Sequence, residues 1–241
     1  MDRVIKKLNN IDHAHLSVAP GYSEALGDGV MTCLAYTAEM RALQGTYPLL
    51  FQEIAEENHP LTVALMGLEQ GENLFLNDGQ WVGQAIPMMM QKGPFLIAQE
   101  SNHQSEATSV IAIDENHPKV LTAGGEEVFS QTGGYSNYLE RIITILERIE
   151  GSHAHTLAFA EHLTQLKLLT PLEFNLKLEN GTEHVLSGFS GIDEDRLIKL
   201  NPDELQSLQA QNFLLPLFMV VASQGQMTRL VTLKNQAATA L

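Results

Sequence analysis

Short runs of apolar, β-prone residues separated by turn-forming pairs fill the first part of the chain. Pro20-Gly21 and Asn77-Asp78-Gly79 are such turns, and the second is typical of a tight β-hairpin. A short helix is expected at 37–43 with Thr37 as its N-cap, and a methionine-rich helix is expected to begin at Pro87. We expect strands at residues 15–19, 29–36, 47–54, 61–68, 73–76, 95–99, 109–114 and 128–129.

The pattern changes to a helical period from Tyr135 onward. Gly151-Ser152 is expected to end this helix, with Ser152 capping a second one that runs to about residue 168. Residues 172–178 then alternate apolar and polar side chains, and Asn180-Gly181 turns the chain back, which predicts a β-hairpin. A capping box from Asn201 to Glu204 begins a further helix, followed by an apolar segment and a polar tail.

These patterns predict an α+β fold. We expect a mostly antiparallel β-rich part over residues 1–134, packed with a helix-rich part over 135–241 that contains one β-hairpin. A chain of 241 residues is long enough for two lobes and short enough for one domain, so we expect a single compact body.

The charge of the chain restricts its partners. It has 14 Lys and Arg against 29 Asp and Glu, a formal net charge of −15, and its longest run of cations is Lys6-Lys7. Nucleic-acid binders concentrate cations to displace the counterions of phosphates, so we expect no nucleic-acid partner. The longest apolar stretch, residues 213–222, is about half of what spans a bilayer. The first residues lack the apolar core of a signal peptide, and we expect a cytoplasmic location.

Motifs of common catalytic sites are not found. The chain has no G-x-S-x-G, no P-loop, no dinucleotide fingerprint and no C-x-x-C, and the loop from Gly67 to Gly71 lacks the lysine of a phosphate cradle. Cys33 stands alone in an apolar run, where a buried, inert thiol is favoured over a reactive one. We therefore predict no catalytic residue and no cofactor.

A group of histidines invites a metal interpretation. His155 and His162 share a helix face but lie about 10.5 Å apart along the axis, which is too far for one ion. Glu150 and His153 match one half of a di-iron signature, and such sites need two copies. We favour solvated or capping histidines over a metal site.

Motifs spread over the chain resemble those of one bacterial family. They are YPLLF at 47–51, GLEQGENLF at 67–75, Trp81, a P-x6-PF element at 87–95 and GFSGIDEDRL at 188–197. HLSV at 15–18 and AEM at 38–40 extend the likeness toward the N-terminus. In this order and spacing the chain resembles the SapC family over about residues 11–225. It departs at Leu49-Leu50, where branched aliphatics are usual, and at Gln70, where proline is common.

The resemblance implies an accessory to surface-layer or nutrient-uptake systems. Such proteins often accompany TonB-dependent receptors and flavoprotein halogenase-like enzymes, and the family offers no catalytic residue set to carry over. An unrelated peptide-transporter permease shares the name, but a chain without a membrane span does not resemble it.

Polar and aromatic residues in or beside these motifs are the candidates for binding: His15, Glu39, Arg41, Tyr47, Asn73 and Trp81. Trp81 with a nearby tyrosine can form a shallow binding wall, although a core tryptophan with a satisfied indole N–H is favoured. His15 is either a ligand contact or, as we favour, a strand-edge residue bonded to backbone. The three methionines after Pro87 are interpreted as core rather than as a pliable binding surface.

The sequence thus favours a non-enzymatic accessory protein that binds a protein or peptide partner. The alternative is an enzyme acting on a small molecule or peptide, with or without a metal, beside a halogenase-like flavoprotein. A structural surface-layer subunit fits poorly with the expected cytoplasmic location. The apolar C-terminal segment also suggests self-association into a homo-oligomer, although a core helix explains it equally well.

Overall fold

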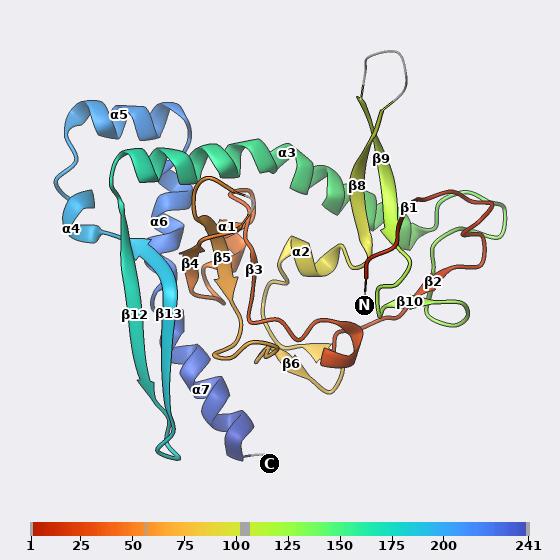
Figure 1. Ribbon diagram of the computed structural model, residues 1–241, viewed down its shortest axis with the longest axis horizontal. Coiled ribbons are helices and arrows are strands. Elements are labelled where there is room, and N and C mark those ends of the chain that lie inside the picture. The colour runs from red at the N-terminus through yellow and green to blue at the C-terminus, as the bar shows by residue number, and fades with distance from the viewer. Residues whose placement is uncertain (1, 56, 102–106, 240–241) are drawn as a thin grey trace.

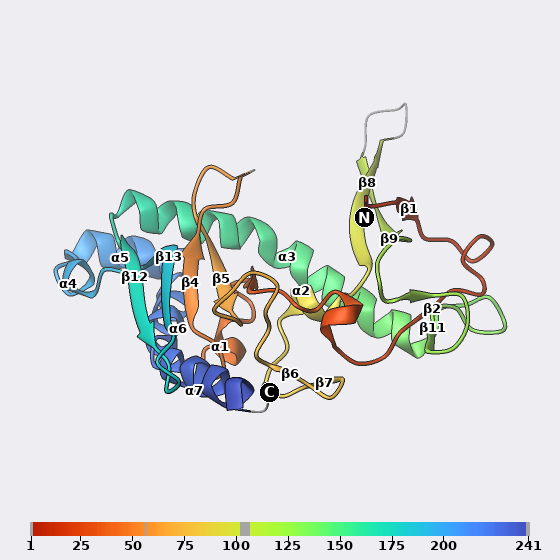
Figure 2. The ribbon, with the colours of Figure 1, turned by 60° about the horizontal axis from the view of Figure 1, so that its bottom comes forward.

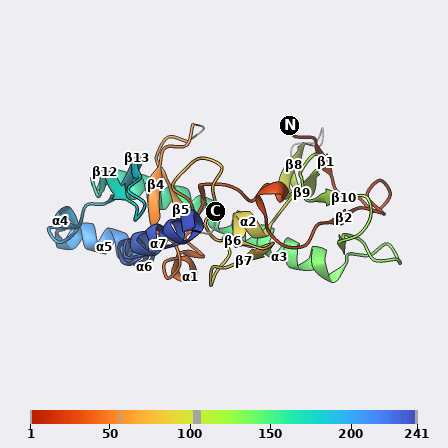
Figure 3. The same ribbon diagram turned by 90° about the horizontal axis from the view of Figure 1, so that it is seen from below.

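A helix of 29 residues, α3 (Asn137–Gln165), extends along the molecule and joins two separate hydrophobic cores (Figures 1 and 3). The computed structural model describes residues 2–55, 57–101 and 107–239. Leu139 and Leu146, in the first half of α3, pack into the smaller core, and Phe159 and Leu163 pack into the larger one. We call the parts of the chain around these cores the small lobe and the large lobe.

The large lobe is built on an antiparallel sheet in the order β12-β13-β4-β5-β3. Its strands are β3 (Thr32–Leu34), β4 (Leu49–Gln52), β5 (Leu61–Leu65), β12 (Leu169–Lys177) and β13 (Glu183–Ile192). Every residue of β5 and the first three of β4 are buried, so these middle strands are covered on both faces. The sheet combines strands from both sides of residue 134, and the predicted β12–β13 hairpin is confirmed.

Helices cover this sheet. They are α1 (Met40–Leu43), α4 (Glu194–Leu197), α5 (Pro202–Ala210), α6 (Leu214–Ser223) and α7 (Gln226–Thr239). α6 packs against β4 and β13, α1 packs beside α6, and Figure 2 shows α6 and α7 next to the β12–β13 hairpin. The capping box predicted at the start of α5 is confirmed, since the Asn201 and Glu204 side chains each bond to the other's backbone N–H.

The small lobe contains two three-stranded sheets. One has the order β1-β9-β8 and the other β10-β2-β11, and the first half of α3 packs against β8. The strands are β1 (Ile5–Lys7), β2 (Ser17–Val18), β8 (Phe95–Ser101), β9 (Ala107–Asp114), β10 (Val120–Leu121) and β11 (Glu126–Glu127). Four short elements lie along the connections between the lobes: the 3-10 turn η1 (Glu24–Leu26), the pair β6 (Leu76–Asn77) and β7 (Gln80–Trp81), and helix α2 (Met88–Gln91).

The predicted break at Gly151-Ser152 is wrong, because α3 continues through it. The Ser152 hydroxyl donates to the Arg148 carbonyl at 2.7 Å, and the Thr156 hydroxyl donates to the Ser152 carbonyl at 2.8 Å. Because both hydroxyls donate to carbonyls one turn back in the same helix, Ser152 does not act as the N-cap of a second helix. Gly151 therefore costs α3 some stability without ending it.

Other predicted boundaries are corrected by a few residues. Thr37 is not the N-cap of α1, since the helix begins at Met40 and its N-cap is Glu39. Residues 15–19 and 73–76 contain strand only at 17–18 and at residue 76. Phe129 forms a single bridge with Tyr135, and the strand beside it is β11 at 126–127. The α+β class and the antiparallel sheets are confirmed.

Within the described residues, no single helix has both the length and the apolar character to cross a bilayer. Helices α5 and α6 pass that test only when taken together, and they meet at a bend of 99°.

Candidate functional site

Tyr47 and Trp81, two of the predicted binding residues, contact each other, with Trp81 at the end of β7. The Trp81 indole N–H donates to the Tyr47 hydroxyl at 2.7 Å, and that hydroxyl donates in turn to the Ala85 carbonyl. Tyr47 is fully buried, and burial raises the pKa of its phenol. The indole N–H is satisfied inside the protein, as the core interpretation of Trp81 requires, and no polar atom of this pair is left for a ligand.

Asn73 ties the family-like turn at 67–75 to a buried ion pair. Its amide nitrogen donates to the Asp28 carbonyl at 3.0 Å, and its carbonyl oxygen accepts from the Phe75 N–H at 3.0 Å. The Asp28 carboxylate lies 2.8 Å from the Lys119 ammonium, and both side chains are about 5 % exposed or less. A Cβ on Gly67 would lie 2.4 Å from the Glu72 carbonyl oxygen, so the turn requires glycine there.

These contacts join into one polar cluster between the lobes, which we call the junction network. The Lys119 ammonium lies 4.2 Å from the centroid of the Tyr22 ring, and that ring meets the Trp81 ring edge-on at 5.3 Å. Its members are Tyr22, Asp28, Tyr47, Asn73, Trp81 and Lys119. Tyr47, Asn73 and Trp81, which lie in the family-like motifs, are therefore joined to Tyr22, Asp28 and Lys119 from outside these motifs, and the network links the two lobes.

Glu39 and Arg41 face in different directions, as their spacing predicts. The Glu39 carboxylate is buried and accepts the backbone N–H of Met88 at 2.8 Å and of Tyr36 at 3.2 Å. Burial raises the pKa of Glu39 to about 7, against the opposing effect of these two bonds. Arg41 is exposed on α1. Glu39 thus fixes the start of α2, whereas Arg41 lies on the surface of α1 and does not contribute to this contact.

His15 lies apart from the other candidates, in the small lobe. It is exposed in the turn before β2 and lines a polar hollow of about 730 Å³ together with Gly124, Gly125 and Ser130. The structure therefore does not bring His15 together with Tyr47, Trp81 or Glu39.

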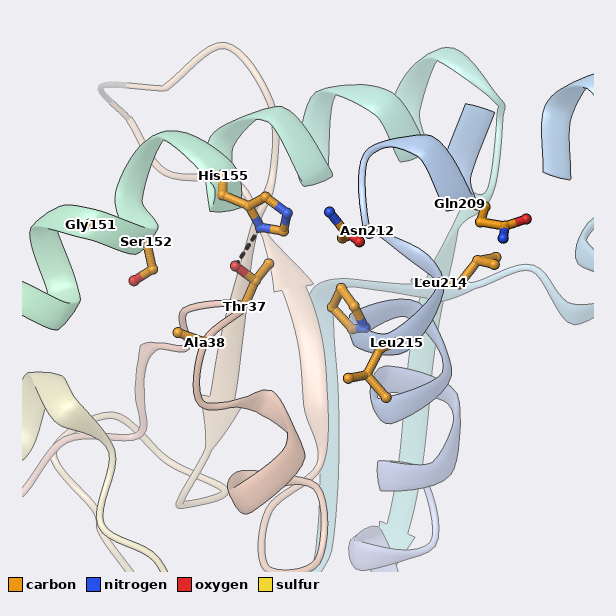
Figure 4. Close-up of a pocket in the computed structure, with 10 residues that line it drawn as sticks. Thr37, Ala38, Gly151, Ser152, His155, Gln209, Asn212, Leu214 and Leu215 are labelled. Atoms are coloured by element: carbon orange, nitrogen blue, oxygen red, sulfur yellow. Dashed lines mark hydrogen bonds between the residues drawn. The ribbon is translucent and has the colours of Figure 1, made fainter. Parts of the chain in front are cut away.

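A cavity of about 580 Å³ opens between α3, the approach to α1 and the α5–α6 connection (Figure 4). We call it the α3–α6 cavity. It is lined by Thr37, Ala38, Gly151, Ser152, His155, Gln209, Asn212, Leu214, Leu215 and Pro216. Figure 4 shows His155 reaching down from α3 to Thr37, with Leu214 and Leu215 on the opposite wall. These residues come from three distant stretches of the chain.

Hydrogen bonds to His155 and Thr156 of α3 hold together the three segments that form this cavity. The Gln211 carbonyl can only accept, so Nε2 of a neutral His155 carries the proton and donates to it at 3.0 Å. His155 Nδ1 then accepts from the Thr37 hydroxyl at 2.8 Å, and the Thr37 N–H donates to the Thr156 hydroxyl at 3.1 Å. Both ring nitrogens are engaged, so His155 positions three segments and offers no free base.

The mouth of the cavity continues into an exposed apolar surface on α6. Leu215 lines the cavity and is 53 % exposed, and Phe218, one turn further, is 50 % exposed. Ala222 is exposed on the same side of the helix, at the next turn. We call Leu215, Phe218 and Ala222 the α6 face. With no carboxylate, lysine or cysteine among the ten lining residues, the cavity suits an apolar side chain better than a reaction.

His162 and Cys33 have local explanations. His162 bonds to the Ser207 hydroxyl at 3.0 Å, which joins α3 to α5. Burial raises the pKa of the Cys33 thiol, which agrees with an inert thiol. Within the described ranges, no three His, Cys, Asp or Glu side chains are placed to share a metal ion.

The sequence did not reveal the α3–α6 cavity, because its walls meet only in the folded chain. The one local signal was the pair Leu215 and Phe218, apolar at helical spacing with Leu217 and Val220 buried beside them. The core contact of α6 needs only the side that contains Leu217 and Val220. The additional apolar residues on another side of the helix were the pattern that could have indicated the cavity.

The fold and these sites define an α+β protein with a polar cluster between its lobes and an open apolar cavity, without a recognisable catalytic centre in the described residues. The chain belongs to the SapC family, whose model matches residues 8–230. Searches of the curated proteins and of the solved structures find no match.

Proposed function

We propose that this SapC protein is a non-enzymatic binding protein that holds a partner protein at the α3–α6 cavity and the adjoining α6 face. One observation carries the proposal: an apolar helix face, half exposed at Leu215 and Phe218, leads into a cavity of about 580 Å³. Exposed apolar residues that adjoin a cavity mark interaction sites more often than scattered ones do.

The charge of the molecule supports a basic partner. The net charge of −15 attracts cationic surfaces over long range, and the apolar contact then provides affinity after encounter. The partner we expect therefore inserts one or more apolar side chains from a basic surface. A role beside surface-layer or TonB-type uptake systems, on the cytoplasmic side, follows from the resemblance to the family and belongs to the same proposal. The enzyme alternative gains no support from the cavity, whose histidine is fully bonded.

The test is site-specific photocrosslinking in the native host. A benzophenone amino acid replaces Phe218, and the matched control carries it at Val185, which is 60 % exposed on the β12–β13 hairpin. We expect a crosslinked partner at Phe218 only. Binding of that purified partner should weaken about tenfold or more in Phe218→Ser and not in Val185→Ser.

Two outcomes would contradict the proposal. Equal crosslinking at both positions would show that the α6 face is not a specific surface. A crosslink only to a second copy of the chain would assign the α6 face to self-association instead of a separate partner.

A further inference from the structure

A third hollow, of about 360 Å³, lies between the lobes and shares no lining residue with the α3–α6 cavity. We call it the interlobe groove. Its walls come from β3, α2, the start of β8 and the first residues of the chain. Apolar side chains form much of its lining: Val30, Leu34, Met89, Met90 and Leu96.

Lys92 places an ammonium group in this groove without a carboxylate partner among the described residues. Its Nζ donates to the Phe95 carbonyl at 3.2 Å and, at a long 3.4 Å, to the Gly93 carbonyl. Neutral carbonyls satisfy part of the donor capacity of an ammonium and none of its charge. In a chain with 29 acidic residues, a half-buried lysine without an acidic partner is informative.

His117 adds a second donor beside Lys92. Its Nδ1 accepts the backbone N–H of Lys119 at 3.1 Å, so the neutral ring carries its proton on Nε2. Nε2 has no hydrogen-bond partner in the part of the chain that the structure describes. Arg3, with a side chain 82 % exposed, also lines the groove and provides a third donor group, the second that is cationic.

The two carboxylates that line the groove are already occupied. Asp28 is paired with Lys119 at 2.8 Å. Asp114 accepts the backbone N–H groups of Val4 at 3.0 Å and Asn116 at 3.2 Å, and its approach to Arg3 is a long 3.9 Å. With Lys119 included, three cationic groups (Arg3, Lys92 and Lys119) face two carboxylates (Asp28 and Asp114), so the groove keeps one positive charge in excess as well as unused donors.

The lowered pKa values of Lys92 and His117 agree with this excess of positive charge. Burial and the charge of Arg3 lower the pKa of Lys92, with Asp114 acting in the opposite direction. Burial, Lys119 and Lys92 lower the pKa of His117, opposed by Asp114 and Asp28. An anion in the groove would relieve this repulsion and raise the pKa of both groups.

We propose that the interlobe groove binds the carboxylate of an apolar organic acid. Lys92 and His117 donate to the carboxylate oxygens, Arg3 approaches from the solvent side, and the hydrocarbon part packs on Met89, Met90 and Leu96. The unpaired positive charge of the groove favours an anionic group in the ligand, and the apolar lining favours a hydrocarbon part. A carboxylate attached to a hydrocarbon chain has both.

Calorimetric titration with sodium octanoate tests the proposal. We expect saturable binding to the wild type, weakened about tenfold or more in Lys92→Met and weakened to a lesser degree in Arg3→Gln, which changes an exposed residue and preserves the fold. Lys199→Met is the matched control, because Lys199 is exposed and outside the groove. In NMR spectra, octanoate should also raise the pKa of His117.

Further ligands separate the sources of such a carboxylate. If a short apolar peptide with a free C-terminal carboxylate competes with octanoate, the groove also binds the C-termini of polypeptides. If this peptide does not compete, the groove binds small organic acids only. Equal binding of the amidated peptide or of octylammonium would overturn the proposal, as would octanoate binding that Lys92→Met leaves unchanged. Since the two sites share no residue, these results are independent of those for the α6 face.

Discussion

Glu39 shows how a single buried carboxylate can make stability depend on pH. It holds the backbone N–H groups of Tyr36 and Met88, yet burial outweighs these bonds and its pKa is about 7. A folded-state pKa above the unfolded value means that the protonated form is favoured by folding. The stability from this group is complete below about pH 4.5 and is lost as the pH rises through 7.

We predict that Glu39→Gln removes this dependence. Between pH 5.5 and 8 the wild type should lose about 2 kcal/mol more free energy of unfolding than the variant does, because 1 pKa unit corresponds to about 1.4 kcal/mol. Urea titrations at several pH values, all above the pI of 4.9, measure the difference. Glu53→Gln, at an exposed position, is the control and should follow the wild type. A pH-independent difference between wild type and Glu39→Gln would contradict the assignment.

Elements that depend on local sequence were predictable. The capping box at Asn201 and the β12–β13 turn at Asn180-Gly181 each use residues within four positions of one another, so the sequence contains the whole signal. The continuity of α3 through Gly151-Ser152 was not predictable, because the low helix propensity of this pair is overridden when the helix packs into a core on each side of it.

The candidate site was predictable only in part, for the same reason. Tyr47, Asn73 and Trp81 were singled out and do converge, but on the junction network that binds the lobes together. The α3–α6 cavity and the interlobe groove bring together residues more than 80 positions apart, such as Lys92 with Arg3 and Thr37 with His155. No local pattern reports such contacts.

Within α3, Gly151→Ala is expected to stabilise the protein. A Cβ at Gly151 meets no atom within 4 Å, so the gain in helix propensity, about 0.5–1 kcal/mol, is not offset by a clash. Gly67→Ala provides the contrast, because its Cβ would approach the Glu72 carbonyl oxygen to 2.4 Å and should destabilise the fold. Urea midpoints followed by fluorescence report both changes. A loss of stability in Gly151→Ala would show that α3 is strained at this point.

At the scale of the molecule, α3 is the element common to both cores. Leu139, Ile142 and Leu146 belong to one core, and Phe159 and Leu163 belong to the other. Among residues 2–55, 57–101 and 107–239, no strand pairing crosses between the lobes, so their mutual placement depends on α3, the junction network and the connecting segments.

Gly151→Pro should uncouple the lobes. Proline removes the hydrogen bond to the Glu147 carbonyl and bends the helix, at a cost of about 3 kcal/mol or more. Trp81 is the single tryptophan, packs on the larger core and contacts Tyr22, so its fluorescence reports the large lobe and the junction network, whereas far-UV circular dichroism reports both lobes as a whole. We expect the two urea transitions to coincide in the wild type and in Gly151→Ala, and to separate in Gly151→Pro. Coincident transitions in all three proteins would mean that the other connections alone keep the lobes cooperative.

The length of α3 has a mechanical consequence. A continuous helix of 29 residues is a stiff rod of about 43 Å, and a tilt of about 5° at one end displaces the other by about 4 Å. The same helix lines the α3–α6 cavity with His155 and Ser152 and packs into the core of the small lobe with its first half. If the proposed partner moves α3 away from α6, we expect the small lobe to be displaced as well, because α3 is continuous from one core to the other.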